Sequence, residues 1–290
     1  MARRSSSRTQ ADTVARLEIA FLGDPTQPIN GDILMGDLND KVAIVLGAST
    51  TGGMGEAIAR RLKAEGAALV VSGLGDAPLQ ALARELGGSA CEADITQEAQ
   101  IKKLVEFARQ IYGRLDIAVN VAGVAPRVPF KDFTEEHLMF MAKMHFIGPA
   151  MFIKHVAEHI VIGGAIVNIS SLSAYDPLSG IVGYAASKRA GDRVVQGAAL
   201  EYRHKRLRIN GIIPSLVPTQ LSRDGMRNFG HDPEAFEKSF VDLTPLGRIS
   251  RPEDIAAFAY MLVRDEFFET GQIWNYSGGN SLLGHPRYLA

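Results

Sequence analysis

The stretch VAIVLGASTTGGMG, residues 42–55, decides the fold expected of this chain. Its first part, residues 42–47, is an apolar run ending in glycine, which is typical of a strand buried on both faces of a sheet. Residues 56–66 then have helical spacing and end at a glycine. Glycines between a strand and a helix let the backbone approach a pyrophosphate, which the first N–H groups of the helix bind. We therefore predict a phosphate-binding turn, with a turn that serves packing alone as the alternative.

Strand and helix patterns continue to alternate along the chain after this turn. Further strands are predicted at residues 68–73, 90–95, 115–123, 164–170, 207–213 and 271–278, and helices at 78–86, 97–112, 135–162, 184–202 and 252–263. Because such alternation requires crossover connections, the sheet should be parallel with helices on both faces. We predict one α/β domain, residues 40–290, with a seven-stranded, doubly wound Rossmann-like sheet that binds its ligands at the carboxyl ends of the strands.

Residues 1–39 differ in composition from the rest of the chain. Residues 1–10 are rich in Ser and Arg, residues 13–22 have the apolar content of a short amphipathic helix, and residues 24–40 have a loop composition. No apolar region of the length that a secretory signal requires follows the arginines, so none is expected. Two interpretations of this extension stay open, a disordered leader and an arm that packs on a neighbouring subunit.

The overall composition excludes several classes of protein. The formal net charge is −1, and a general nucleic-acid binder would show a basic excess. No apolar run is long enough to span a membrane. The single cysteine, Cys91, cannot form an intrachain disulfide, which fits a reducing compartment, and we expect a cytoplasmic location. No metal site is predicted.

A tyrosine and a lysine in YAASK, Tyr184 and Lys188, stand four residues apart on a predicted helix and therefore share one face. Ser171 stands 13 residues before Tyr184, just past a strand that ends in NISS. The sequence NVAG at residues 120–123 ends another strand. Each motif alone is weak evidence, but the motifs together with the glycine turn form a pattern that is specific to one family. Over about residues 38–283 the chain resembles the short-chain dehydrogenase/reductase family.

The resemblance implies an NAD(P)-dependent oxidoreductase with Ser171, Tyr184 and Lys188 as catalytic residues. Tyr184 would exchange a proton with the substrate oxygen, and the Lys188 ammonium would lower a phenol pKa that is otherwise about 10. Lys188 would also bind the nicotinamide ribose, and Ser171 would orient the substrate. His145 stands where the family often has a relay asparagine, and a relay role and a packing role both stay open.

The resemblance also implies a set of cofactor-binding residues. They are Gly47, Ser49, Thr50, Thr51, Gly53, Met54, Gly73, Asp94, Ile95, Asn120, Ala122, Gly123, Tyr184, Lys188, Pro214, Val217 and Thr219. The glycine turn looks two residues longer than the family's TGxxxGxG. Gly73 and Leu74 stand where the family has an acidic residue for NAD or an arginine for NADP, so the choice between NAD and NADP stays open. Asp94 either lies beside the adenine or, with Thr96, signals a helix N-cap.

Three segments should wall the substrate, residues 124–133, 172–183 and 216–240. They carry apolar side chains at Val128, Phe130, Leu172, Tyr175, Leu178, Leu221, Met226, Phe229, Phe236 and Phe240. Residues 215–245 are expected to form a mobile substrate loop. We predict an apolar, medium-sized carbonyl or secondary alcohol as substrate. Arg127 and Arg223 either bind a carboxylate or lie solvated on the surface.

The resemblance further implies a homotetramer or homodimer that acts on a small molecule. In the family's PGxxxT motif, Ser215 replaces the glycine, which alters the expected turn. Two other functions stay open. One is a dinucleotide-binding sensor or structural protein, and the other is a non-redox enzyme, a dehydratase or an epimerase, on the same scaffold.

Overall fold

The computed structural model describes residues 38–176, 178–228 and 230–284. The predicted extension, residues 1–39, therefore lies outside the described residues except for its last two positions. The expected amphipathic helix at residues 13–22 falls in that part, as does the expected subunit-packing arm. No helix among the described residues is both long enough and apolar enough to cross a membrane.

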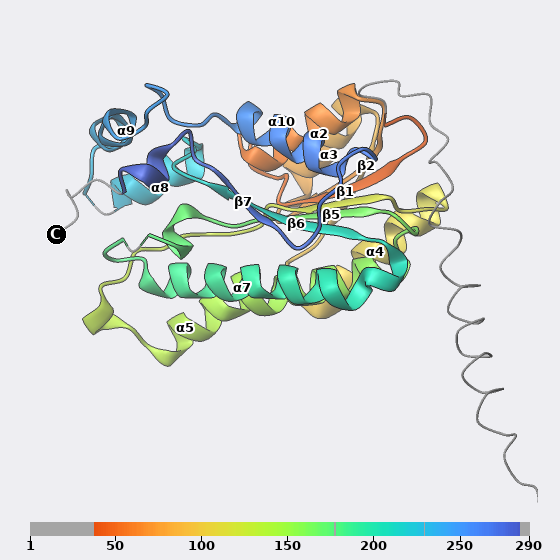
Figure 1. The fold of residues 1–290 in the computed structure, drawn as a ribbon, viewed down its shortest axis with the longest axis horizontal. Coiled ribbons are helices and arrows are strands. Elements are labelled where there is room, and N and C mark those ends of the chain that lie inside the picture. Colours follow the sequence, from red (N-terminus) through yellow and green to blue (C-terminus); the bar gives the residue numbers. More distant parts are fainter. Residues whose placement is uncertain (1–37, 177, 229, 285–290) are drawn as a thin grey trace, which may run out of the picture. The chain divides into compact units, whose positions relative to one another are not determined.

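Seven parallel strands form one sheet in the order β3-β2-β1-β4-β5-β6-β7 (Figure 1). They are β1 (Val42–Leu46), β2 (Ala68–Gly73), β3 (Ser89–Glu92), β4 (Ile117–Asn120), β5 (Ala165–Ile169), β6 (Arg208–Pro214) and β7 (Ile273–Tyr276). Every residue of β1, β4 and β5 is buried, because helices cover both faces of the sheet. The predicted seven-stranded, doubly wound α/β fold is confirmed.

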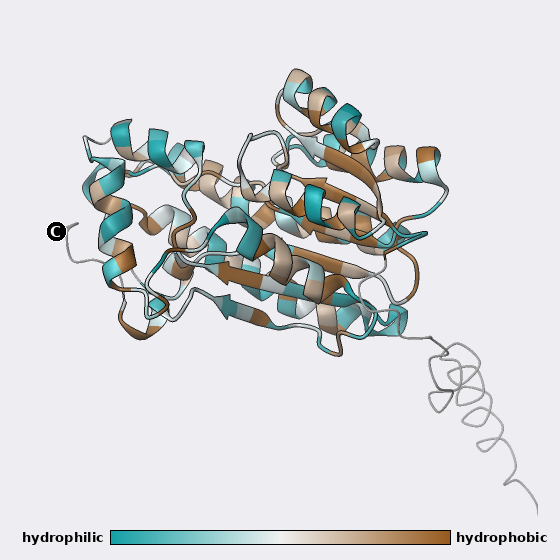
Figure 2. Ribbon diagram, turned by 90° about the horizontal axis from the view of Figure 1, so that it is seen from above, coloured by the Kyte–Doolittle hydropathy of each residue, from teal (hydrophilic) through white to brown (hydrophobic). Residues whose placement is uncertain are grey.

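Two helical layers sandwich the sheet (Figure 1). On one side are α2 (Met54–Ala64), α3 (Asp76–Leu86) and α10 (Pro252–Val263), and on the other α4 (Glu98–Tyr112), α6 (Gly148–His159) and α7 (Val182–Glu201). The apolar positions of each layer pack against one face of the sheet and form two separate core clusters. In Figure 2 the strands are mostly hydrophobic, while the outer turns of the helices carry the polar residues.

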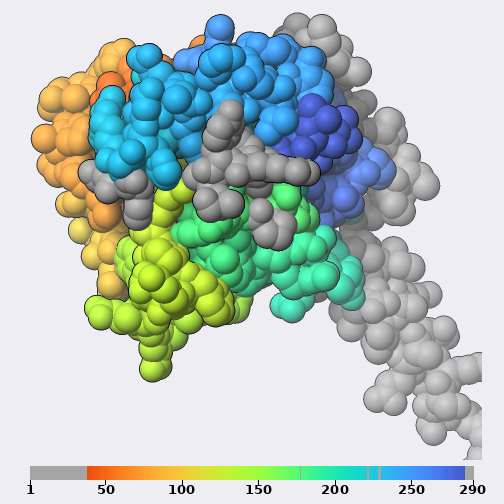
Figure 3. Space-filling model, turned by 90° about the vertical axis from the view of Figure 1, so that its left-hand side faces the viewer, coloured from red at the N-terminus to blue at the C-terminus, as the bar shows by residue number. Residues whose placement is uncertain are grey.

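The strand order reverses at the centre of the sheet. From β1 the chain continues outward to β2 and β3, and it then returns to the other side of β1 to form β4. The carboxyl ends of β1 and β4 therefore diverge into connections on opposite faces, which is where doubly wound sheets bind their ligands. Figure 3 looks onto one end of the domain, with α8 and α9 in cyan and blue above the yellow-green α5 segment.

The single helix predicted over residues 135–162 is three consecutive pieces. They are α5 (Glu135–Ala142), the π-helical turn η2 (Lys143–Ile147) and α6. Pro149 has no N–H group for the carbonyl of His145, so the regular helical bond cannot form there. Gly191 of α7 packs against that carbonyl so closely that a Cβ atom would overlap the oxygen. The result is a π turn with His145 at its centre, and such turns are frequent at functional sites.

The predicted substrate loop, residues 215–245, is largely helical, which the sequence expectation missed. It contains α8 (Gln220–Asn228) and α9 (Pro233–Asp242). Local capping signals account for both helices. The hydroxyl of Thr219 accepts the N–H of Ser222 at 3.1 Å, and Asp232 accepts the N–H of Glu234 at 3.2 Å, directly before a proline at the helix start.

Candidate active site

The glycine turn connects β1 to α2. Gly47 has a φ of 97°, and a Cβ atom there would lie 2.6 Å from the backbone nitrogen of Ala122, so this position excludes a side chain. Gly53, the N-cap of α2, makes no side-chain bond to the helix start. The helix therefore presents backbone N–H groups and the positive end of its dipole to the turn. Thr50 and Thr51 lie within this turn.

The ends of β4 and β5 are joined by two buried asparagines. The Asn120 Nδ2 atom donates to Asn168 Oδ1 at 2.7 Å, and Asn120 Oδ1 accepts the N–H of Ala122 at 3.2 Å. Asn120 thus joins the carboxyl ends of these two strands. Asn168 was missed because its partner lies on a different strand. Next to them, a Cβ at Gly123 would lie 3.2 Å from His145 Nε2 and 3.4 Å from Lys188 Nζ.

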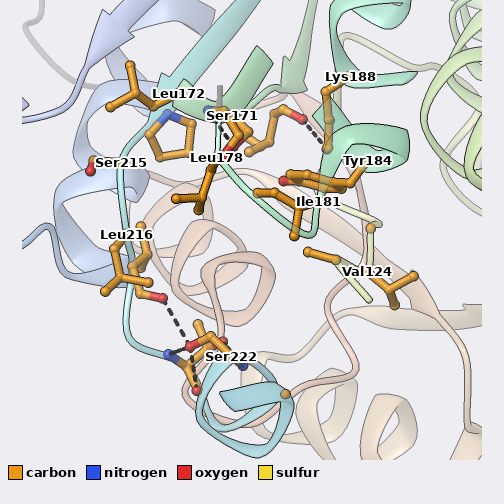
Figure 4. Close-up of a pocket in the computed structure, with 18 of the residues that line it drawn as sticks. Val124, Ser171, Leu172, Leu178, Ile181, Tyr184, Lys188, Ser215, Leu216 and Ser222 are labelled. Atoms are coloured by element: carbon orange, nitrogen blue, oxygen red, sulfur yellow. Dashed lines mark hydrogen bonds between the residues drawn. The ribbon is translucent and has the colours of Figure 1, made fainter. Parts of the chain in front are cut away.

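Ser171, Tyr184 and Lys188 line one cavity of about 560 Å³ (Figure 4). Ser171 lies two residues after the end of β5, and Tyr184 and Lys188 lie one turn apart on α7. The Lys188 ammonium donates to the carbonyl oxygen of Ile169 at 2.7 Å and lies 5.8 Å from the centroid of the Tyr184 ring. Figure 4 shows Tyr184 and Ser171 on one side of the cavity and Ser222 across from them.

Burial controls the protonation of this group. Burial raises the pKa of Tyr184. Hydrogen bonding to Ser171 acts against this rise, and the negative charge of Asp192 adds to it. Burial also lowers the pKa of Lys188 to about 8, against the opposing effect of Asp192. In the balance of these effects the phenol pKa rises, whereas the resemblance implied that Lys188 would lower it. The ammonium is bonded to the Ile169 carbonyl, and the desolvation of Tyr184 is the larger effect.

His145 is buried, with 1% of its surface exposed, and both ring nitrogens are engaged. The N–H of Val124 donates to Nε2 at 3.3 Å, and Nδ1 lies 3.2 Å from the Ser187 hydroxyl. The ring meets that of Tyr184 edge-on, with centroids 5.0 Å apart. Burial and the Lys188 charge lower the pKa of His145 to about 2, so the imidazole is neutral at physiological pH.

Asp192 belongs to the same cluster and was missed from the sequence. It is 2% exposed, and the Ser170 hydroxyl donates to its Oδ2 atom at 2.8 Å. Burial raises the pKa of this carboxyl group, while hydrogen bonding to Ser170 and Tyr175 opposes that effect. Asp192 stands four residues after Lys188 on α7, so helical periodicity was the signal that places both on one face.

The side of the turn nearest β2 and β3 carries polar groups. Ser49 lies against Gly73, where a Cβ would come within 2.9 Å of its Oγ atom. The N–H of Gly75 donates to Glu92 Oε1 at 2.9 Å. Asp94 accepts both the N–H and the hydroxyl of Thr96, but the N-cap of α4 is Gln97. Of the two interpretations for Asp94, the helix N-cap is therefore wrong. Its neighbour Ile95 is buried.

The end of β6 and the segment after it form the opposite wall of the cavity. Pro214, Val217 and Thr219 all line it. The hydroxyl of Ser215, the residue that replaces the family glycine, donates to Asn280 Oδ1 at 2.7 Å. Ser222 was missed as a lining residue, and the capping motif with Thr219 was the available signal.

The structure brings only part of the predicted set into this cavity. The predicted residues that line it are Met54, Gly123, Ser171, Tyr184, Lys188, Pro214, Val217 and Thr219. Those that lie outside its lining are Gly47, Ser49, Thr50, Thr51, Gly53, Gly73, Asp94, Ile95, Asn120, Ala122 and His145.

The cavity wall has the apolar character predicted for it, but its members differ in part from the predicted ones. The cavity is lined by Leu172, Leu178, Met226, Phe236 and Phe240, and also by Val124, Ile181 and Leu216. Phe130 is 73% exposed, and Tyr175 lines a second cavity instead. The Leu221 and Phe229 side chains lie outside the described residues. Arg127 lines the cavity, whereas Arg223 pairs with Glu237 at 2.7 Å outside it.

The residues present fit a dinucleotide. Gly47 packs directly against the backbone of Ala122, and the N-terminus of α2 has no side-chain cap on its backbone N–H groups. The cavity begins at Met54 of that helix and reaches Tyr184 and Thr219. A pyrophosphate at the helix N-terminus and a nicotinamide in the cavity would follow from this arrangement.

Known proteins that are similar to this chain also include oxidoreductases and dehydrogenases. The chain matches the family described as Enoyl-(Acyl carrier protein) reductase over residues 47–281. An uncharacterized oxidoreductase of Methylorubrum extorquens is 35% identical over 254 residues, covering 84% of this chain and 99% of that protein. A 4-formylbenzenesulfonate dehydrogenase of Comamonas testosteroni is 33% identical over 260 residues, covering 85% and 100%. A short-chain type dehydrogenase/reductase structure from Mycobacterium ulcerans has a TM-score of 0.79 at 29% identity, covering 87% and 94%.

The matched region includes the glycine turn, the strand ends and the YAASK helix. The similar proteins are full-length matches that are named as oxidoreductases and dehydrogenases. The chain therefore belongs to the short-chain dehydrogenase/reductase family and is an NAD(P)-dependent oxidoreductase that acts on carbonyl or alcohol groups.

Proposed function

We propose that this enzyme interconverts an apolar, medium-sized carbonyl compound and its alcohol, with Ser171, Tyr184 and Lys188 as the catalytic residues. The observation that carries the proposal is that Ser171, Tyr184 and Lys188 line one cavity whose remaining wall is mostly apolar. An apolar wall binds the body of the substrate, and a small polar group orients its reactive oxygen.

When bound, the nicotinamide supplies or accepts the hydride. Tyr184 holds its proton at neutral pH because burial raises the pKa of its phenol, so it is ready to donate to a carbonyl oxygen. Ser171 hydrogen-bonds the same oxygen and fixes its orientation. Lys188, with a pKa of about 8, holds or releases a proton near neutral pH beside Tyr184 and binds the ribose hydroxyls.

We assign cofactor binding to the glycine turn after β1 and to residues at the carboxyl ends of the strands. In this proposal Gly47, Ser49, Gly53 and Met54 surround the pyrophosphate, and Val217 and Thr219 hold the nicotinamide carboxamide. The other predicted cofactor residues keep the roles that the resemblance implies. They are Thr50, Thr51, Gly73, Asp94, Ile95, Asn120, Ala122, Gly123 and Pro214.

The proposed cofactor is NAD rather than NADP. Gly73 and Leu74 offer neither a carboxylate nor a cation at the end of β2. Glu92, paired in register with Gly73, places its carboxylate on the N–H of Gly75. A carboxylate in this loop repels a ribose 2′-phosphate.

We further propose a homotetramer or homodimer in the cytoplasm. Leu138, Met139 and Phe140 of α5 expose 44%, 48% and 43% of their surface, which supports a subunit contact on that helix. Sedimentation of the full chain tests the oligomeric state.

A panel of aldehydes, ketones and secondary alcohols tests the proposed function. The panel includes aromatic aldehydes, because one relative is named for such a compound. Turnover is followed by nicotinamide absorbance, and nucleotide affinity is measured separately by titration. Tyr184→Phe should abolish turnover and leave nucleotide binding within about twofold. Tight nucleotide binding without turnover of any panel member would instead favour the sensor, and conversion without net absorbance change would favour a dehydratase or epimerase.

A further inference from the structure

One cation on the wall of the cavity has no counter-ion among the residues that the structure describes. Arg127 is partly buried in the loop after β4 and lines the same cavity as Tyr184. Among the described residues its guanidinium makes no hydrogen bond and no ion pair, and its recorded contact is with the ring of Phe236, 5.6 Å away. That contact uses one face of the guanidinium and leaves its five N–H donors free.

Burial lowers the pKa of Arg127, yet a guanidinium of ordinary pKa above about 12 stays charged at neutral pH. Partial desolvation of an unpaired charge costs free energy, which a bound anion offsets. The surface arginines near the cavity are already paired. Arg223 binds Glu237 and Arg227 binds Asp224.

Arg127 is held in place from both sides. The N–H of Val128, the next residue, donates to the carbonyl of Gly180 at 2.7 Å. Its ring partner Phe236 belongs to α9 and is almost fully buried with Phe240 and Met226. A fixed backbone and a packed ring beneath the guanidinium reduce the entropy that ligand binding would cost.

The other charges in the cavity leave Arg127 as the free anion-binding group. Lys188 and Asp224 are the remaining charged side chains that line it in the described part of the chain. Lys188 donates to the Ile169 carbonyl. Asp224 Oδ1 accepts both Gln220 and Arg227, at 2.8 and 2.9 Å, on the exposed side of α8.

We propose that Arg127 binds an anionic group of the substrate, a carboxylate or a sulfonate, at the end of the apolar body remote from the reactive carbonyl. This inference rests on the proposed function, because it names the substrate class of that same site. The apolar side chains that line the cavity together with Tyr184 and Arg127 contact the body of the substrate, so the enzyme selects anionic carbonyl compounds over neutral ones of the same size.

Matched aldehydes test the selectivity. Benzaldehyde, 4-formylbenzoate and 4-formylbenzenesulfonate share a ring and a reactive group and differ in the remote anion. We expect the kcat/KM of at least one anion to exceed that of benzaldehyde by about tenfold to a hundredfold, as a charged hydrogen bond permits. Arg127→Met should remove this ratio, and Arg127→Lys should restore part of it. Arg223→Met, a matched change on the paired surface arginine, should keep the ratio within about twofold.

A binding experiment separates the two proposals. Benzoate, benzenesulfonate and neutral benzamide are titrated into the full-length protein by calorimetry, which needs no turnover. Binding of an anion that Arg127→Met weakens by about tenfold or more supports the anion site even where no aldehyde is reduced, and that result would overturn only the proposed function. Equal kcat/KM values for charged and neutral aldehydes, or anion affinity that is the same in wild type and Arg127→Met, would overturn the anion site. The two anions distinguish a carboxylate preference from a sulfonate preference.

Discussion

The Nδ1 atom of His145 lies 3.2 Å from the Ser187 hydroxyl, and that hydroxyl donates to the carbonyl oxygen of Tyr184 at 2.8 Å. The Nε2 atom accepts the N–H of Val124, so the single proton of the neutral ring lies on Nδ1. Neither nitrogen is free for a water molecule. The geometry favours the packing role over the relay role, because His145 connects three parts of the fold. They are the π turn η2, the loop after β4 at Val124, and α7 through Ser187.

The first prediction follows from the buried neutral imidazole. Burial lowers the His145 pKa from 6.5 to about 2, so the unfolded chain binds a proton below pH 6.5 that the folded chain does not. This contribution to stability is present above pH 6.5 and is lost as the pH falls. His145→Asn should therefore flatten the pH dependence of the unfolding free energy between pH 6 and 4, by up to about 1.4 kcal/mol per pH unit.

Urea unfolding at a series of pH values measures this slope. His204→Asn is the matched control, because His204 is exposed in the short 3-10 helix (Tyr202–Lys205) after α7, and it should leave the slope of wild type unchanged. A slope in His145→Asn that equals wild type would show that the folded state takes up a proton at this site.

The second prediction concerns Asp192, which faces Ser170 and Tyr175 from one side and Lys188 and Arg189 from its own helix. Its negative charge raises the pKa of both Lys188 and Tyr184. Asp192→Asn keeps an acceptor for Ser170 and removes the charge, so both pKa values should fall. The pH profile of alcohol oxidation should move to lower pH by about half a unit or more, as loss of a charge within a few ångströms permits. Exposed Asp242 supplies the control variant Asp242→Asn, and an unshifted profile in Asp192→Asn would contradict the argument.

The parts of the site that the sequence predicted are those set by local pattern. The apolar run of β1, the glycines after it and the i, i+4 spacing of Tyr184 and Lys188 all depend on neighbours in sequence. The π turn at His145, the Asn120–Asn168 pair and the burial that raises the Tyr184 pKa depend on segments that meet only in the folded chain. The helices α8 and α9 are intermediate between these two cases. Their capping residues, Thr219 and Asp232, can be read in the sequence, but the helices are too short for a clear periodic pattern.

The third prediction tests the cofactor assignment at the end of β2. Glu92→Gln should strengthen NADPH binding by about tenfold, since the carboxylate that repels the 2′-phosphate is removed, while NADH affinity changes by about twofold or less. Fluorescence titration of each reduced nucleotide gives both constants without turnover. Glu106→Gln, on the exposed face of α4, is the control for a general change in charge. Tight NADPH binding by wild type would contradict the assignment.

The fourth prediction concerns the Ser215–Asn280 contact, which ties the base of the α8–α9 segment to the C-terminal part of the domain. Asn280 has 0% of its surface exposed, accepts the Ser215 hydroxyl and donates to the carbonyls of Leu243 and Gly284. Asn280→Ala should cost about 1–3 kcal/mol of unfolding free energy, because it leaves buried polar groups without partners.

Ser215→Ala removes one bond of this network and should cost less than the change at Asn280. In the double variant the two costs should overlap by about 0.5 kcal/mol or more, because the residues share one contact. The double variant should also raise the KM for the carbonyl substrate more than it lowers kcat. The reason is that Val217 and Thr219, just after Ser215, line the cavity, while Tyr184 lies on α7. If the losses of unfolding free energy in the two single variants simply add in the double variant, the Ser215–Asn280 contact contributes nothing to stability, and this prediction is wrong.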